Sequence, residues 1–143
     1  MKIVSISISK KKGTRKDQVN EAFVKKDHGL ENDAHAGPWH RQVSFLSAES
    51  IDHARRSQGL DVGFGDFAEN VATVGIVWEK LPVGTRVKLG GQAVVEVTQI
   101  GKTCHNKCAI YYQAGDCIMP RKGVFARVVE DGMIRVGDGI EVL

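Results

Sequence analysis

The alternation of apolar and polar residues along the chain predicts a protein built mostly of β-strands. Residues 2–9 alternate with a period of two, which is typical of a half-buried strand. Residues 93–100, with the sequence AVVEVTQI, give the strongest strand pattern in the chain. Further strands are predicted at residues 18–25, 42–46, 71–74, 83–89, 124–129 and 136–142.

One helix stands out among these strands. Ser47 is a good N-cap residue, and Glu49 is well placed for the positive end of the helix dipole. Gly59 supplies a stop signal, so we expect a helix ending near residue 57 or 58. Ile51 and Ala54 are predicted to face the core.

The spacing of strands and turns favours one fold class. Many short strands, one clear helix and frequent glycine turns predict a mostly β, barrel-like single domain over residues 1–143, with one or two short helices. Segments 83–89 and 136–142 resemble each other, because each places a glycine turn before an alternating strand. We interpret that similarity as recurring turn chemistry rather than a repeat.

Two polar segments interrupt the strands. Residues 10–16 are basic and contain Gly13 and Thr14, which indicates either a solvated turn or a loop in which Lys12, Thr14 and Lys16 contact phosphate. Residues 28–41 are rich in Gly, Asn, Asp and His and lack an apolar period, so they are predicted to be a loop of the kind on which sites are built.

Composition narrows the class of protein. The net charge is +3 and aromatic residues make up only 6% of the chain, which fits a small anionic ligand and argues against a nucleic-acid partner. We find no signal peptide and no apolar run long enough for a membrane span. The three cysteines are therefore expected to be reduced thiols in a cytoplasmic protein.

All three cysteines fall in one short segment, at positions 104, 108 and 117. Lys102, Lys107 and Arg121 surround them with positive charge, which favours the thiolate form of a cysteine. A thiolate can bind a soft metal, attack a sulfur or acyl centre, or carry a persulfide. Cys104, at a predicted strand end, is the favoured reactive residue, whereas Cys117 could equally be a buried apolar residue.

Two metal sites remain as alternatives. A structural zinc site could combine the three cysteines with a histidine, although the spacing differs from the usual paired arrangements. His35 and His40 could also ligate a metal with Asp33, but such residues more often orient a loop through hydrogen bonds. No glycine-rich phosphate loop of the usual kinds is present.

Five separated motifs stand in order along most of the chain. They are GL..DAHAG..HRQVS at residues 29–44, GDFAEN at 65–70, LPVGT at 81–85, TQIGK.CH at 98–105 and GDCIMPR.GVFARV at 115–128. Together they resemble the MOSC domain family, named after the C-terminal domain of molybdenum cofactor sulfurases, and most nearly its short bacterial stand-alone forms. At residues 32–33 the family usually has Gly-Asp, and Asn32 can adopt the same left-handed turn.

The resemblance implies stable or transient binding of the molybdenum cofactor through a pterin phosphate and a metal ligand. By position, Cys104 is the expected metal or sulfur ligand, and Cys117 is its competitor as the reactive residue. The residues expected to bind the cofactor are Asp33, His35, Arg41, Glu69, Asn70, Lys102, Arg121 and Arg127. The expected partners are the cofactor or its biosynthesis and sulfuration proteins, and no pyridoxal phosphate is expected in this chain.

Three functions follow from this interpretation. The first is a cofactor-binding or sulfur-carrier protein in molybdoenzyme maturation, whose enzymatic form would be a sulfur transferase. The second is a molybdenum-dependent reductase of N-hydroxylated compounds, which would need electrons from a partner, since the chain has no flavin or iron–sulfur motif. The third is a structural-zinc or interaction module. The small size of the chain favours the first.

Overall fold

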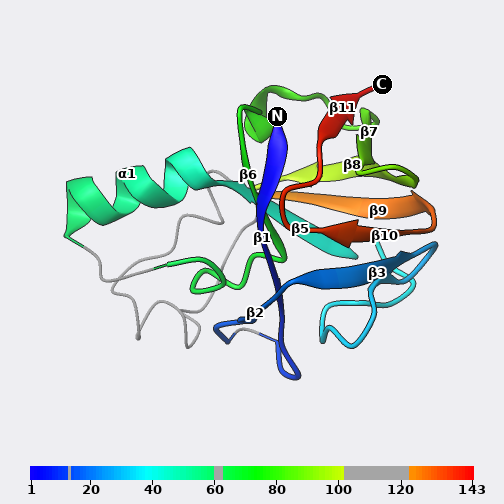
Figure 1. Ribbon diagram of the computed structural model, residues 1–143, viewed down its shortest axis with the longest axis horizontal. Coiled ribbons are helices and arrows are strands. Elements are labelled where there is room, and N and C mark those ends of the chain that lie inside the picture. The colour runs from blue at the N-terminus through cyan, green and yellow to red at the C-terminus, as the bar shows by residue number, and fades with distance from the viewer. Residues whose placement is uncertain (13, 60–62, 102–122) are drawn as a thin grey trace.

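The structure is a computed structural model that describes residues 1–12, 14–59, 63–101 and 123–143. These residues form strands, one α-helix and one 3₁₀ turn (Figure 1). The helix is α1 (Ala48–Gln58) and the 3₁₀ turn is η1 (Trp78–Lys80). The strands are β1 (Lys2–Ile8), β2 (Asp17–Val19), β3 (Glu21–Lys25), β4 (Gly29–Leu30), β5 (Val43–Ser47), β6 (Val71–Val74), β7 (Arg86–Leu89), β8 (Ala93–Ile100), β9 (Val124–Glu130), β10 (Gly132–Arg135) and β11 (Ile140–Val142).

The described strands form two sheets. The larger has eight strands in the order β11-β7-β8-β9-β5-β6-β1-β2, and the smaller has the order β10-β3-β4. Strands β5 and β6 pair in parallel, and α1 lies in the connection between them. A parallel pair needs such a crossover, because the chain must return to the same end of the sheet. The predicted mostly β fold with one α-helix is confirmed.

The described sheets do not close into a barrel. Strands β11 and β2 are the two edges of the larger sheet, and no ladder joins them in the described part of the chain. A single bridge between Lys2 and Gly139 nevertheless brings the start of β1 to the residue before β11. The sheet is thus strongly curved, which accounts for the barrel-like pattern of short strands.

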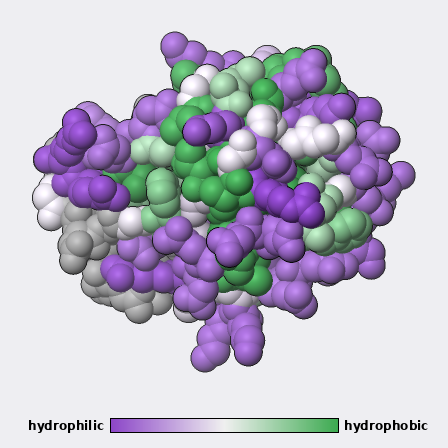
Figure 2. Space-filling view, viewed as in Figure 1, coloured by the Kyte–Doolittle hydropathy of each residue, from purple (hydrophilic) through white to green (hydrophobic). Residues whose placement is uncertain are grey.

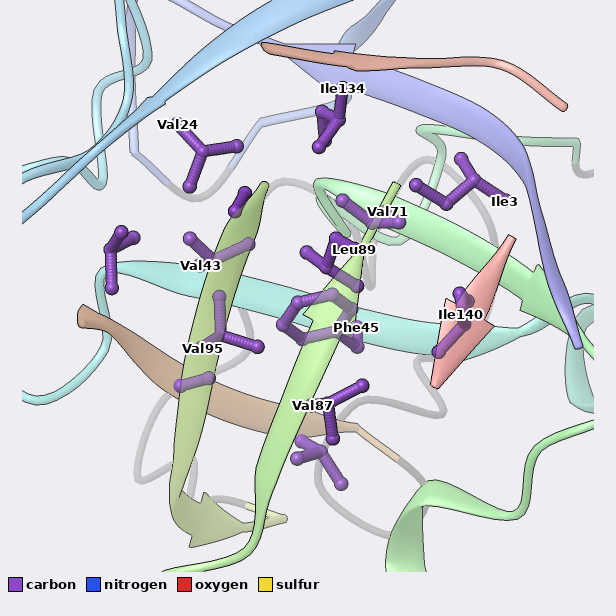
Figure 3. Close-up of a cluster of buried hydrophobic side chains, with 14 of the residues drawn as sticks. Ile3, Val24, Val43, Phe45, Val71, Val87, Leu89, Val95, Ile134 and Ile140 are labelled. Atoms are coloured by element: carbon purple, nitrogen blue, oxygen red, sulfur yellow. The ribbon is translucent and has the colours of Figure 1, made fainter. Parts of the chain in front are cut away.

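The main hydrophobic core lies between the two sheets (Figure 3). Val24 and Ile134 project from the small sheet toward Val43, Phe45 and other residues of the large sheet. Phe45 also stacks on Trp78 of η1, with ring centroids 4.3 Å apart. A smaller cluster on the other side of the large sheet packs Ile51 and Ala54 of α1 against it, as predicted, so β5 is buried on both faces.

Helix α1 begins and ends where the sequence predicts. The Ser47 hydroxyl accepts a hydrogen bond from the Ser50 N–H at 3.1 Å, and Gly59 adopts the left-handed conformation with φ of 65°. Both signals are local, because an N-cap satisfies a free N–H of the first turn and a glycine tolerates positive φ.

The strand predictions are mostly confirmed, with four differences. The segment predicted as one strand over residues 18–25 forms β2 and β3, which belong to different sheets, and β4 lies inside the segment 28–41 that was predicted to be a loop. In β1 the register shifts between Ile3 and Ser5, and this bulge lets both Ile3 and Ile6 enter the main core. Strand β10 was not predicted, because it is short and follows β9 after a single residue. The two similar segments, 83–89 and 136–142, pair with each other as β7 and β11, with Ile140 opposite Leu89.

Candidate functional site

Gln99, near the end of β8, joins the loop of residues 28–41 to the strand that leads into the cysteine segment. Its side-chain oxygen accepts a hydrogen bond from Arg41 Nε at 3.1 Å and lies 2.9 Å from His40 Nε2. Its amide nitrogen donates to the Gly101 carbonyl at 2.7 Å. The neighbouring Thr98 hydroxyl donates to the carbonyls of His40 and Phe125. The end of the loop is therefore fixed against β8 and β9.

The residues that flank the cysteine segment lie close to Gln99. The Gly101 N–H donates to the Gly123 carbonyl at 2.6 Å, so the two residues that flank residues 102–122 are held together. Gly101 has a φ of 67°, a conformation that glycine adopts without strain. The predicted site residues Lys102, Cys104, Cys117 and Arg121 lie outside the described residues.

Arg41 carries a positive charge close to these flanking residues. Its guanidinium carbon lies 5.2 Å from the centroid of the Phe125 ring and 5.9 Å from that of Trp39. Such contacts hold an arginine by cation–π attraction without neutralising it. Within the described ranges, no carboxylate forms an ion pair with Arg41. Its charge can therefore attract an anionic group of a ligand.

Arg127 lies on β9 near the same loop, but the Glu96 carboxylate largely balances its positive charge. Its Nε donates to Glu96 at 2.8 Å, and Arg86 reaches the other oxygen of Glu96 at 3.4 Å. The hydrogen bond from Arg127 lowers the pKa of the Glu96 carboxyl. Arg127 lines a hollow of about 440 Å³ together with Asp27, Pro38, Trp39, His40 and Gln42.

Asp33 and Lys16 form a buried ion pair beneath the loop. The Lys16 ammonium donates to Asp33 Oδ1 at 2.7 Å, and neither side chain is exposed to solvent. The backbone N–H groups of Ser9 and His35 donate to the two carboxylate oxygens at 3.0 and 3.1 Å. Burial raises the pKa of Asp33, but the hydrogen bond and charge of Lys16 outweigh it and hold this pKa below its ordinary value. The start of the loop is thus tied to the end of β1.

Lys16 also determines which ring nitrogen of His35 carries the proton. Lys16 Nζ lies 3.0 Å from His35 Nδ1 and 3.0 Å from the Ser9 hydroxyl. An ammonium group has only donors, so His35 Nδ1 must accept, and the imidazole proton is carried by Nε2. About 20% of the His35 side chain is exposed. His35 thus lies at the edge of the buried ion pair and is partly open to solvent.

These contacts argue against metal binding by Asp33 and His35. Both Asp33 oxygens already accept hydrogen bonds, and His35 Nδ1 faces an ammonium group. Among the described residues, no group of three or more His, Cys, Asp or Glu side chains is arranged to hold a metal ion. The hydrogen-bonding interpretation of this loop is the one that the geometry supports.

Glu69 and Asn70 are buried deeper in the same polar network. Glu69 accepts from the N–H groups of Gly65 and Phe67, at 2.7 and 3.2 Å. Burial raises the pKa of Glu69 to about 7, although its hydrogen bonds with backbone N–H groups oppose this shift. The Asn70 amide donates to the Ser7 carbonyl and accepts from Ser44, so it joins β1 to β5. Both side chains hold the scaffold and are inaccessible to solvent.

The structure thus divides the predicted site residues into two groups. Asp33, Glu69 and Asn70 are buried and hydrogen-bonded to the protein, whereas His35, Arg41 and Arg127 are partly exposed. The sequence suggested Lys16 only as a solvated or phosphate-binding residue, and it gave Gln99 no role of its own. Lys16 sits in a basic run that indicates exposure, and its burial corrects the interpretation of that run as wholly solvated or phosphate-binding. Asn32, as expected, adopts positive φ, at 68°.

Comparison with known proteins identifies the fold. The family model described as MOSC domain matches residues 32–141. YuaD from Bacillus subtilis superposes with a TM-score of 0.80 at 18% identity, covering 99% of this chain and 94% of that one. YiiM from Geobacillus stearothermophilus gives 0.75 at 23% identity, covering 99% and 74%, and YiiM from Escherichia coli gives 0.69 at 21% identity, covering 100% and 70%. No curated protein matches this chain significantly.

Proposed function

This chain belongs to the MOSC domain family, which is associated with binding of the molybdenum cofactor, and on that premise we propose that it binds this cofactor during the maturation of molybdoenzymes. In this role it would store or deliver the cofactor, or carry sulfur for it, without a demanding catalytic step of its own. The observation that carries the proposal is the contact of Gln99 with both Arg41 and Gly101. This contact brings a cation that has no ion-pair partner among the described residues close to the start of the cysteine segment.

The exposed groups near Gln99 suit an anionic ligand. Arg41 offers a fixed positive charge, and Arg127 offers a second one that Glu96 partly offsets. Guanidinium groups bind phosphate through paired, charge-assisted hydrogen bonds. In our proposal Arg41, Arg127 and His35 bind the pterin phosphate and neighbouring polar groups, with Lys102 and Arg121 as further cations.

The soft ligand in this proposal is a cysteine. Cys104 is the expected ligand of molybdenum or carrier of sulfur, and Cys117 is the alternative. When bound, the cofactor would supply a metal centre that prefers thiolate ligands and can hold sulfur. Asp33, Glu69 and Asn70 are proposed as positioning residues, because their contacts fix the loop and strands from which the exposed groups project.

The chain is further proposed to be a single domain over residues 1–143 that acts in the cytoplasm, with cofactor biosynthesis or sulfuration proteins as partners. Strands β1 and β3 precede the start of the family match, yet they pair with β6 and β10 within it. Reduced thiols suit a reducing compartment. Among the described residues, no helix is long and apolar enough to cross a membrane.

The test is molybdenum retention after anaerobic incubation with released cofactor and desalting. Wild type is compared with Cys104→Ser, Cys108→Ser and Cys117→Ser. Stoichiometric molybdenum in wild type, lost only in Cys104→Ser, is the expected result and names the ligand. Loss of molybdenum only in Cys117→Ser would identify Cys117 instead as the ligand in the same site. Wild-type protein that retains no molybdenum would contradict direct cofactor binding.

A further inference from the structure

A second hollow lies between strands β1 and β2, away from Gln99. It has a volume of about 530 Å³, and we call it the β1–β2 hollow. Its lining includes the apolar residues Ile8 and Val19 and the charged residues Lys10, Lys11, Arg15 and Asp17. It shares no lining residue with the hollow beside Arg127. A volume of this size is in the range of small-molecule sites.

The charge of the β1–β2 hollow is positive. Three of its lining residues are cations, against one carboxylate. In the part of the chain that the structure describes, no carboxylate forms an ion pair with Lys10 or Lys11. Figure 2 shows hydrophilic residues on the projection at the lower edge of the molecule, where Figure 1 draws the connection between β1 and β2. The hollow therefore favours an anion.

One lining residue of the hollow, Arg15, carries a donor without a partner among the described residues. The Nε–H of Arg15 is shielded from solvent and donates to no acceptor within the described ranges. The nearest carboxylate oxygen, Asp66 Oδ1, is 4.0 Å away, which is too long for a hydrogen bond. A buried donor without a partner is uncommon in folded proteins. The Arg15 guanidinium is therefore not fully hydrogen-bonded by the described residues, although its charge contributes to the hollow.

The loop that carries these cations is held in place. The hydroxyls of Ser9 and Thr14 both donate to the Lys11 carbonyl, at 2.9 and 3.0 Å. The Lys12 ammonium lies 4.8 Å from the centroid of the Trp39 ring. Ser9 is also tied to the buried Asp33 by its N–H. A loop fixed in this way loses less entropy on binding than a free one.

The floor of the hollow adds a preference for an apolar group. Ile8 and Val19 are only half-buried and pack against the main core from its edge. Apolar surface left partly open at the floor of a cationic hollow would be covered by a ligand that has an apolar part as well as a charge. We propose that the β1–β2 hollow is a separate binding site for a phosphomonoester that carries a small apolar group.

Phenyl phosphate and inorganic phosphate are the probes. Each is titrated into the full ¹⁵N-labelled chain without molybdenum cofactor, at constant ionic strength, while amide shifts are followed. Saturable shifts are expected for amides within residues 8–19. Phenyl phosphate should bind about tenfold more tightly than inorganic phosphate, because the ring covers Ile8 and Val19. Shifts that do not saturate, or equal affinity for the two probes, would overturn the proposal.

The matched variants remove two adjacent charges each. Lys10→Gln/Lys11→Gln changes the hollow, whereas Lys25→Gln/Lys26→Gln changes two exposed lysines outside it. The first should weaken phenyl phosphate binding about tenfold and the second should leave it unchanged, because only the first removes charge-assisted hydrogen bonds. Equal weakening in both would mean general charge attraction and would overturn the site.

Molybdenum retention separates this inference from the proposed function. Lys10→Gln/Lys11→Gln should retain molybdenum like wild type while it loses phenyl phosphate binding. Loss of both together would make the hollow part of the cofactor site and would overturn its independence. Absence of molybdenum retention in wild type, with phenyl phosphate binding intact, would contradict the proposed function alone.

Discussion

At the scale of single residues, Lys16 and Asp33 control how the loop of residues 28–41 leaves the sheet. Their buried ion pair also holds the Ser9 hydroxyl and His35 Nδ1 around one ammonium group. A buried charge is costly when its partner is removed, because no water can replace the lost contact. The pair therefore holds the loop in position, and its loss should lower the stability of the whole fold.

Replacement of Lys16 should expose this dependence. In Lys16→Met, Asp33 keeps its two backbone donors but loses its cation. We expect the free energy of unfolding to fall by about 3–5 kcal/mol, measured by chemical denaturation at neutral pH. The control Lys25→Met, at an exposed position, should change it by less than about 0.5 kcal/mol. Equal stability of the two variants would show that the buried pair contributes nothing.

Glu69 should make stability depend on pH. Burial raises the pKa of Glu69 from 4.5 to about 7, so between these values the folded chain holds a proton that the unfolded chain has released. The stabilising contribution of this proton is complete below pH 4.5 and is lost as the pH rises toward 7. Wild type should therefore lose about 3 kcal/mol relative to Glu69→Gln across this window.

The measurement is the free energy of unfolding of both proteins over this pH range. The comparison between them cancels the titration of all other groups, because only residue 69 differs. A difference between wild type and Glu69→Gln that stays constant with pH would mean that Glu69 keeps an ordinary pKa in the folded chain.

At the scale of elements, the turn of residues 65–70 depends on the absence of a side chain at Gly65. This residue has a φ of 86°, and a Cβ atom there would lie 2.3 Å from the Lys16 carbonyl oxygen. The close approach lets the Lys16 N–H donate to the Gly65 carbonyl at 2.8 Å. The turn and the end of the basic loop are therefore packed backbone against backbone.

Gly65→Ala should be strongly destabilising. The substitution combines positive φ with a clash against backbone that cannot rotate away, and we expect a loss of at least about 2 kcal/mol in thermal or chemical unfolding. Gly91→Ala is the control, because φ there is not in the left-handed region and a Cβ would meet no atom within 4 Å. If Gly65→Ala unfolds like Gly91→Ala, the backbone packing described above is not required.

Local signals allowed some elements to be predicted and not others. Helix α1 follows from Ser47 and Gly59, which act within one turn of their own positions. Strand β8 follows from a segment rich in β-branched residues. The burial of Lys16 depends on Asp33, and the role of Gln99 depends on Arg41, far away along the chain. Such contacts leave no mark on the local pattern, so the sequence indicated the segments of the site but not the residues that join them.

At the scale of the whole molecule, the two sheets share one main core. Val24 and Ile134 of the small sheet pack with Phe45 and Val95 of the large one. Strands before residue 32 and strands after residue 123 belong to both sheets. Residues distant in sequence therefore stabilise the same core, as expected for a single domain.

One cooperative unfolding transition is the expected consequence. Far-UV circular dichroism, which reports strands, and tryptophan fluorescence, which reports the buried Trp78 among other residues, should give the same midpoint in denaturant. Two separated transitions would contradict the single-domain proposal for residues 1–143.

In the proposed function, the loop of residues 28–41 meets at Gln99 the strand that leads into the cysteine segment, and both segments act on a common anionic ligand. Substitution of Arg41 tests this relation without altering a cysteine. The matched control is Arg56→Gln, which removes the same charge from an exposed position on α1, where 80% of the side chain is open to solvent.

The most direct measurement is bound molybdenum per chain as a function of released cofactor concentration, for wild type, Arg41→Gln and Arg56→Gln. Wild type and Arg56→Gln should bind equally, and Arg41→Gln should bind at least about tenfold more weakly, because a charged hydrogen-bond donor is lost. Equal binding by Arg41→Gln and wild type would contradict the claim that the loop and the cysteine segment share one ligand.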